Sequence, residues 1–229
     1  MNLEALWSSK EEAEWEAADR HYDSFVKSEN VNLEEELEAK MCQIVSLEDI
    51  RVLHLSENWY DLLLNKYFKW KYTSANRYAT TSKSFCDAYE TNKPLLDRLI
   101  VSILSEPDKL DTELMGFKTN RIHGLGIAGA SGLLSLLYPK LYGTIDQFVV
   151  NNLKQILSLP ENGKIRKMNP MNLGLKDLTV LTEIYRRKSR ELNEQFQSDR
   201  WTPRRIDRVL WGLRPVGTIE RRNSRESGI

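Results

Sequence analysis

The chain has 229 residues, of which 41% are hydrophobic and 29% charged, and its 33 basic residues equal its 33 acidic residues in number. These values are ordinary for a soluble globular protein with one or two domains and a sizeable core. No apolar run approaches the length of a membrane span, and the N-terminus lacks the basic and apolar regions of a signal peptide, so we expect a cytoplasmic protein. Cys42 and Cys86 are far apart and outside any C-x-x-C motif, which excludes a zinc site, a disulfide scaffold and a four-cysteine iron–sulfur cluster.

The zero net charge hides a division along the chain. Residues 1–61 contain sixteen acidic and five basic residues, whereas the remainder contains seventeen acidic and twenty-eight basic residues, so the balances are −11 and +11. This division favours a second part that faces a polyanion. The alternative for the first part is a set of acidic helices that are merely well solvated.

The N-terminal part is predicted to be helical. A helix over residues 8–25 has a serine start, acidic residues in its first turn and an apolar stripe. A second helix over 31–44 has its own stripe, and a third begins at Ser46. The two stripes consist of Trp15, Ala18, Tyr22 and Phe25, and of Leu33, Leu37, Met41 and Ile44. No segment of the chain shows sustained period-2 alternation, so the predicted fold class is all-α.

Aromatic and basic residues alternate in the segment 58–90, "NWYDLLLNKYFKWKYTSANRYATTSKSFCDAYE". Such a mixture suits a nucleic-acid surface, because cations bind phosphates while aromatic rings stack on exposed bases. The equally weighted alternative is a helix end whose aromatic rings fill the core while lysine stems cover it. A buried helix is expected to follow over 91–104.

The centre of the chain predicts a helical hairpin. Leu110 and Leu114 indicate a short helix that ends near Gly116, and a second helix begins near Ile127 after "HGLG". Gly124 and Gly126 allow a tight hairpin, which points free N–H groups of the second helix outward to hold an anion such as a phosphate. The second helix has one apolar stripe, made of Ala130, Leu133, Leu134 and Leu137. Asp146 starts a third helix, whose apolar face carries Val149, Leu153 and Ile156.

The C-terminal part begins with a loop-like, basic stretch over 157–178 that contains Lys164, Arg166 and Lys167. A helix follows over 178–196, and another begins with Thr202 as N-cap and Pro203 in the first helical position. The predicted organisation is an N-terminal helical lobe over 1–105, a hairpin region with C-terminal helices over 106–214, and a disordered tail over 215–229.

The segments "RIHGLGIAGASGLLSLLYP" and "GTIDQFVVNNL" resemble the helix-hairpin-helix element and the trailing aspartate of the helix-hairpin-helix DNA glycosylases. The resemblance covers roughly a fifth of the chain. It implies a two-lobed helical fold with a DNA-binding cleft, and Asp146 as the catalytic carboxylate that stabilises a cationic sugar or orients water. DNA contacts are expected at the hairpin residues His123, Gly124, Gly126 and Ala128, and at the cations Lys69, Lys71 and Arg77. Trp70 and Tyr72 are expected to contact the flipped base.

The resemblance also constrains the reaction. Bifunctional members place a nucleophilic lysine where this chain has Ala128, so the match favours a monofunctional, water-dependent glycosylase. No cofactor or metal is expected, apart from a monovalent cation held by carbonyl groups at the hairpin. The expected partner is double-stranded DNA with a modified base, without a membrane, and the protein is expected to be a monomer.

The substrate is open between two classes of base. The divergent first half resembles glycosylase-fold proteins of bacterial anti-phage defence, some of which remove hypermodified phage bases such as glucosylated hydroxymethylcytosine. Repair of oxidised or alkylated bases is the alternative. Two other functions also stay open, namely DNA binding without catalysis, and a protein-interaction scaffold.

Overall fold

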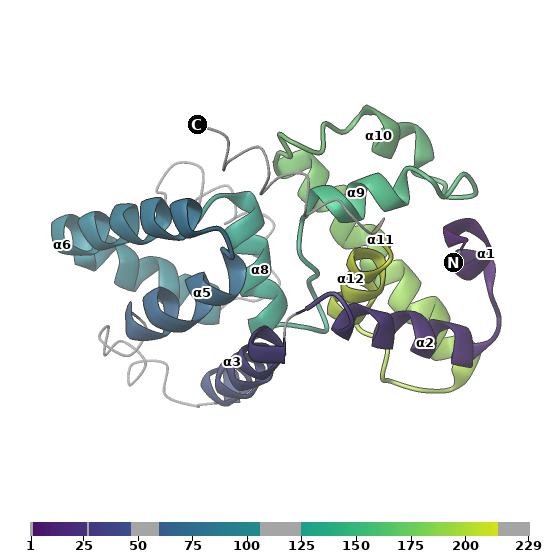
Figure 1. Cartoon of the computed structure of the whole chain (residues 1–229), viewed down its shortest axis with the longest axis horizontal. Coiled ribbons are helices and arrows are strands. Elements are labelled where there is room, and N and C mark those ends of the chain that lie inside the picture. The colour runs from purple at the N-terminus through teal and green to yellow at the C-terminus, as the bar shows by residue number, and fades with distance from the viewer. Residues whose placement is uncertain (1, 27, 47–59, 106–124, 215–229) are drawn as a thin grey trace.

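The computed structural model describes residues 2–26, 28–46, 60–105 and 125–214 (Figure 1). Within these ranges the chain is all-α and contains no strand, as the sequence predicted. The elements are α1 (Leu3–Ser8), α2 (Glu12–Asp23), α3 (Ser28–Ser46), the π-helical η2 (Leu62–Tyr67), α5 (Phe68–Lys71), α6 (Ala75–Ser105), α8 (Ile127–Leu137), α9 (Gln147–Leu153), α10 (Asn162–Lys167), α11 (Leu175–Phe196) and α12 (Pro203–Gly212).

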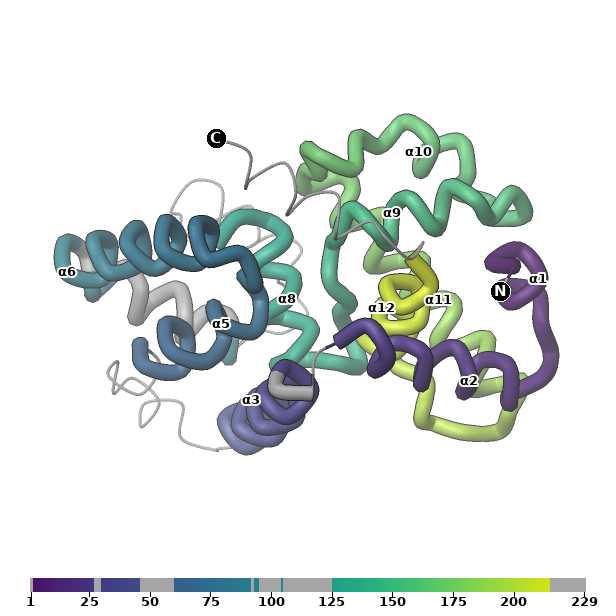
Figure 2. Tube along the Cα trace, in the orientation of Figure 1, coloured from purple at the N-terminus to yellow at the C-terminus, as the bar shows by residue number. Residues whose placement is uncertain are grey.

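Two groups of helices lie side by side (Figures 1 and 2). One group contains α3, η2, α5, α6 and α8, and the other contains α1, α2 and α9 to α12. The helix α2 packs on α12, so the two ends of the described chain share one group. The range 1–105 therefore contributes helices to both groups. The helix α8, which comes later in the chain, belongs to the group that contains α3, η2, α5 and α6.

The predicted N-terminal stripes are buried over most of their length, whereas Phe25, which follows α2, and Leu33 and Ile44 of α3 are half-buried. Trp15, Ala18 and Tyr22 of α2 are buried, as are Leu37 and Met41 of α3. Burying each large apolar side chain contributes about 1.5–3 kcal/mol, which is why these short amphipathic helices are stable only in packed form. The aromatic core between the chain ends is completed by Trp201, whose ring centroid lies 5.8 Å from that of Trp15.

The helix α8 is buried more completely than one apolar stripe predicts. Every residue from Gly129 to Leu137 is buried, including Ser131 and Ser135. The reason is its position, because α8 contacts α3 on one side and α12 on another. The two glycines in "GASG" leave room for side chains of η2 and of the end of α5.

Some predictions differ from the structure or lie outside the described residues. The stretch 157–178, predicted to be loop-like, contains the helix α10, whose preceding residue Glu161 accepts two hydrogen bonds from Arg187 of α11. Six residues are too few for a recognisable helical period. Ser46, predicted to begin a helix, is the last residue of α3, and the residues that follow it are not described. The helix expected to end near Gly116 and the tail 215–229 also fall on residues that are not described. No helix in the described part is long and apolar enough to cross a membrane.

Part of the charge division of the sequence is used for internal packing. Arg204 of α12 pairs with Glu34 and Glu38 of α3, and Arg205 of α12 pairs with Asp19 of α2. Further pairs between the two parts join Arg208 to Asp23, Arg200 to Glu12 and Glu16, and Lys66 to Glu36. The acidic N-terminal helices are thus partners of the C-terminal arginines, and these arginines are not available to a polyanion.

Candidate functional site around Asp146

Asp146 is the N-cap residue of α9. Its backbone is extended, with φ −136° and ψ 149°, and its Oδ1 accepts a hydrogen bond of 2.7 Å from the N–H of Phe148. Aspartate is a preferred N-cap because its carboxylate accepts from a free N–H group of the first turn. The predicted helix start at Asp146 is confirmed, and the side chain is partly buried.

The loop that precedes Asp146 is fixed from three helices. The N–H of Thr144 donates to Asp207 Oδ2 of α12 at 2.8 Å, and its carbonyl accepts from the Tyr185 hydroxyl of α11 at 2.9 Å. The N–H of Ile145 donates to Ser131 Oγ of α8 at 2.9 Å. A Cβ at Gly143 would lie 2.8 Å from the Tyr185 ring, so only glycine fits there. These contacts leave the backbone before Asp146 little freedom to move.

The same loop lies close to the start of α8. Ser131 is five residues after Gly126, the N-cap of α8, which is about 7 Å along the helix axis at about 1.5 Å per residue. Gly126 and Ala128 are exposed, and the first N–H groups of α8 receive no side-chain cap from Gly126. His123 and Gly124, the other expected hairpin contacts, lie outside the described residues, and so does part of the expected cation site.

Three residues of the aromatic and basic segment pack on glycines of α8. A methyl group at Gly129 would clash with the Tyr72 hydroxyl, and one at Gly132 would lie 2.7 Å from Tyr67 Oη and 3.1 Å from Lys71 Nζ. The small residues of α8 therefore admit side chains from η2 and the α5 end. The sequence signal was "GASG", which we had interpreted only as the start of a helix.

Lys71 is a partly buried amine with acidic groups around it. Burial lowers the pKa of Lys71, and the charges of Asp146 and Asp207 oppose that effect by raising it. Arg204 and Arg77 lower the pKa further, and the result lies below the usual range. Lys71 and Asp146 thus belong to one electrostatic cluster, although they come from α5 and the start of α9.

Asp207 is a second carboxylate of this cluster, and sequence reasoning missed it because it lies in a helix that reads as purely structural. The residue is 5% exposed, and burial raises the pKa of Asp207 to about 6. The hydrogen bond from the Thr144 N–H and the charges of Arg204 and Lys71 act in the opposite direction. Its Oδ1 has no hydrogen-bond partner among the residues that the structure describes.

Arg214 is another residue that the sequence did not indicate. It is 3% exposed, and its guanidinium lies 3.4 Å from the centroid of the Trp211 ring and 5.2 Å from that of Phe148. Burial lowers the pKa of Arg214, and the charge of Asp146 opposes this. Neither terminal nitrogen has a hydrogen-bond partner within the described ranges. The arginine places a positive charge near Asp146.

The remaining predicted residues are divided between the two sides of α5. Arg77 is exposed, and its guanidinium lies 6.0 Å from the centroid of the Tyr72 ring, so it is on the side of Lys71 and α8. The indole N–H of Trp70 donates to Glu34 at 3.1 Å, and Arg204 lies 5.6 Å from its ring centroid, which gives Trp70 a packing role toward α3. Lys69 is exposed.

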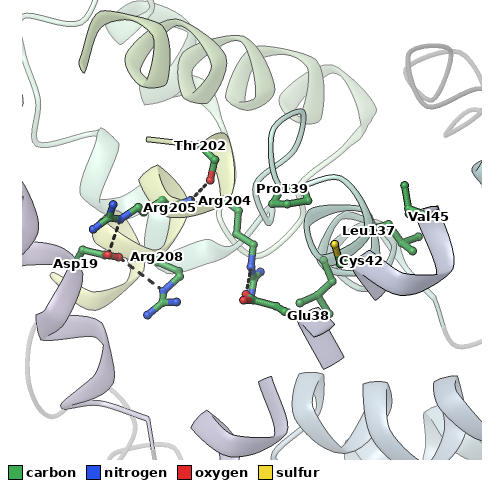
Figure 3. A pocket seen from close by; sticks show the side chains of 11 residues that line it. Asp19, Glu38, Cys42, Val45, Leu137, Pro139, Thr202, Arg204, Arg205 and Arg208 are labelled. Atoms are coloured by element: carbon green, nitrogen blue, oxygen red, sulfur yellow. Dashed lines mark hydrogen bonds and ion pairs between the residues drawn. The ribbon is translucent and has the colours of Figure 1, made fainter. Parts of the chain in front are cut away.

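A cavity of about 510 Å³ opens between α2 and α12 on one side and α3 and α8 on the other (Figure 3). Its lining contains Arg204, Arg205 and Arg208, which point toward Glu38 and Asp19 and pair with these carboxylates. None of the predicted site residues lines it. Since its charges are neutralised internally, we assign no chemistry to this cavity.

The chain was compared with protein-family models, curated proteins and solved structures, and none of them matches it. The chemistry of the site therefore has to be argued from its own residues. A carboxylate with one fixed oxygen, a nearby amine and an exposed helix start can together bind an anion and stabilise a developing positive charge.

Proposed function

We propose that this chain is a monofunctional DNA glycosylase, which hydrolyses the N-glycosidic bond of a flipped modified base. The observation that carries the proposal is the position of Asp146, on a fixed loop bonded to the second turn of α8, near the exposed start of that helix. A phosphate at the start of α8 would place the adjoining sugar within reach of the carboxylate. The resemblance of the hairpin segment to helix-hairpin-helix glycosylases supports the same arrangement, with DNA in a cleft between two lobes.

The proposed mechanism separates binding from chemistry. Free N–H groups at the start of α8 hold the phosphate beside the flipped nucleotide, as Gly126 lets the DNA backbone approach closely. The carboxylate of Asp146 faces the sugar as the base departs and stabilises the positive charge that develops at C1′. Its Oδ1 is held by the Phe148 N–H, and its Oδ2 has no hydrogen bond to another described residue.

Water is the proposed nucleophile. Ala128 occupies the position at which bifunctional glycosylases carry their reactive lysine, and its methyl group is exposed and cannot form a Schiff base. The expected product is therefore an abasic site in an unbroken strand.

The proposed substrate is double-stranded DNA with a hypermodified cytosine, such as glucosylated hydroxymethylcytosine of phage DNA, in anti-phage defence. The divergence of the N-terminal half from repair glycosylases supports this class. A repair enzyme for oxidised or alkylated bases is the alternative within the same chemistry. Tyr72 and Arg77, which lie together beside the start of α8, are the proposed contacts of the flipped nucleotide.

The test is to incubate the protein with duplexes that carry different modified bases, phage DNA included, and to measure free base by mass spectrometry. Asp146→Asn should lower the release rate by about 100-fold or more, because it removes a charge that acts on the transition state. Asparagine is as good an N-cap as aspartate, so the variant should fold normally. If no duplex loses a base, the enzymatic proposal is wrong.

A non-catalytic DNA-binding protein is the second candidate, because the exposed start of α8 can hold a phosphate without help from Asp146. In that case Asp146→Asn would keep both the affinity for DNA and its salt dependence, and no abasic site would form with the native chain. An absence of DNA binding at low salt would instead favour a protein-interaction scaffold.

A further inference from the structure

The side chain of Lys71 reaches from the end of α5 to a definite place on α8. Its Nζ lies 3.1 Å and its Cε 3.2 Å from the position that a Cβ on Gly132 would occupy. Gly132 is four residues after Ala128, so it lies on the same face of the helix, about 6 Å further along the axis. The amine is therefore one helical turn from the exposed residues that begin α8.

The surroundings of this amine contain charges from three other elements. The carboxylates are Asp146, at the start of α9, and Asp207, on α12, and the cations are Arg204 on α12 and Arg77 on α6. Burial and the two arginines lower the pKa of Lys71, while the two carboxylates raise it. The net pKa lies below the usual range, so the ammonium gives up a proton more readily than an exposed lysine does.

A comparison with Lys188 shows what is unusual about Lys71. Lys188 is a buried lysine of α11 that donates to the carbonyl of Trp7 at 2.7 Å and to Glu191 at 3.2 Å, so its ammonium is satisfied within the fold. No hydrogen bond or ion pair joins Lys71 Nζ to any residue in the described part of the chain. Its ammonium also makes a cation–π contact with the Trp70 ring, whose centroid lies 5.7 Å away. The protons of Lys71 thus stay available to a ligand.

We infer that Lys71 is the general acid of this site and protonates the base as it leaves, opposite the negative charge of Asp146. This inference rests on the proposed glycosylase function and assigns a catalytic residue to it. As the C1′–N bond breaks, its electron pair moves to the base, and the Lys71 ammonium gives a proton to a ring nitrogen or carbonyl oxygen of that base. The sugar cation then takes water at C1′. The proton that this water loses restores, through solvent, the proton that Lys71 gave.

The experiment measures single-turnover base release against pH, with a duplex that the native chain excises. The native rate should fall at alkaline pH as Lys71 loses its proton. Lys71→Met should lower the rate by about 100-fold or more and abolish this alkaline fall, because the donor is absent. Lys71→Arg should move the fall beyond the measurable range, because arginine stays protonated. Affinity for a duplex with an uncleavable 2′-fluoro nucleotide should change by less than about threefold, since the proton is transferred only in the transition state.

Two control variants separate catalysis from folding. Asp207→Asn removes a carboxylate that raises the pKa of Lys71 and should shift the alkaline fall to lower pH, with Lys71 itself in place. Lys188→Met removes the other buried lysine and should lower the melting temperature, while the rate per folded molecule stays at the native value.

Several outcomes would overturn the inference. The first is that Lys71→Met releases base at the native rate. The second is that Lys71→Met is slower but its rate still falls at alkaline pH as in the native chain. The third is that Asp207→Asn does not shift the pH at which the rate falls. A borohydride-reduced link between Lys71 and abasic DNA would instead make Lys71 a nucleophile. If the native chain releases no base from any duplex, the proposed function and the inference fail together, whereas fast release by Lys71→Met overturns the inference alone.

Discussion

Charged side chains meet in two regions of this protein, with opposite results. Between α12 and the helices α2 and α3, buried arginine is fully paired, as in Arg204, which binds Glu34, Glu38 and Ser135. Around the start of α9, the Lys71 amine and the terminal nitrogens of Arg214 have no hydrogen bond to another described residue, although Asp146 and Asp207 are near. In the first region the charge of Arg204 is paired, whereas the second region has donors without acceptors and two carboxylate oxygens, Asp146 Oδ2 and Asp207 Oδ1, without a hydrogen bond to another described residue.

The difference indicates where the fold is stabilised and where it can act on a ligand. Buried charges need partners, because removing them from water costs several kcal/mol per ion. Paired charges have met that cost inside the chain and specify how the helices pack. Unpaired charges in a partly buried cluster keep the desolvation cost uncompensated. A ligand that supplies the missing partners would offset this cost and would bind more tightly as a result.

Breaking the paired region should have the largest effect on stability. Arg204→Met leaves Glu34, which is 3% exposed, without its ionic partner, and should lower the free energy of unfolding by about 3–5 kcal/mol. Urea denaturation measures this loss. The matched control is Arg200→Met, because Arg200 pairs with Glu12 and Glu16 at the surface and its loss should cost less than about 1 kcal/mol. Equal costs for the two variants would contradict the contrast between the regions.

The next effect concerns Asp207 and depends on pH. Its pKa in the folded chain is about 6, above the ordinary value of 3.8, so the folded state binds the proton more tightly than the unfolded state. The stability that this proton provides is complete below pH 3.8 and is lost as the pH rises through 6. The loss amounts to about 3 kcal/mol, at about 1.36 kcal/mol per pKa unit.

Asp207→Asn removes this dependence while its side-chain oxygen still accepts from the Thr144 N–H. Relative to the native chain, the variant should therefore gain stability by about 3 kcal/mol between pH 3 and pH 7. Urea denaturation across that range measures the difference. Parallel stability curves for the two proteins would show that Asp207 does not titrate in this range.

Arg214 should respond in the opposite way from Arg204. Its guanidinium is buried without hydrogen bonds in the described structure, so Arg214→Met removes a desolvation cost together with a cation–π contact on Trp211. The free energy of unfolding should change by less than about 1 kcal/mol, or rise. Thermal denaturation compares this variant with Arg204→Met. A loss as large as that of Arg204→Met would mean that Arg214 has strong partners.

The smallest effect on stability is expected at Gly126. A Cβ there would meet no atom within 4 Å and the φ of −69° suits any residue, so Gly126→Ala should cost only the preference of an N-cap for glycine over alanine, about 1 kcal/mol or less. The added methyl group would nevertheless stand where a phosphate approaches the start of α8. Affinity for duplex DNA at low salt, measured by anisotropy, should therefore fall while the melting temperature stays nearly constant. Unchanged affinity would move the DNA contact away from Gly126.

Patterns along the chain gave the fold class and several local features correctly. The stripes of α2 and α3 are buried over most of their length, Asp146 begins a helix, and Thr202 caps α12 by accepting from the Arg205 N–H. These features depend on residues within one or two helical turns of each other, so they can be predicted from the local sequence. The interpretation of the −11 and +11 balances as a polyanion surface was incomplete, because five of the basic residues, Lys66, Arg200, Arg204, Arg205 and Arg208, pair with α2 and α3.

The amino-acid order by itself determined that this protein is helical, where Asp146 caps a helix and which helix faces are apolar, because hydrophobic period and capping are local. Only the tertiary structure decided which charges neutralise each other. It placed Arg204 against Glu34, 170 residues away, and left Lys71 beside Gly132 with no ionic partner in the described chain. The free-energy cost of a buried charge depends on its burial and on its distance from other charges in space, and the spacing of residues along the chain predicts neither quantity.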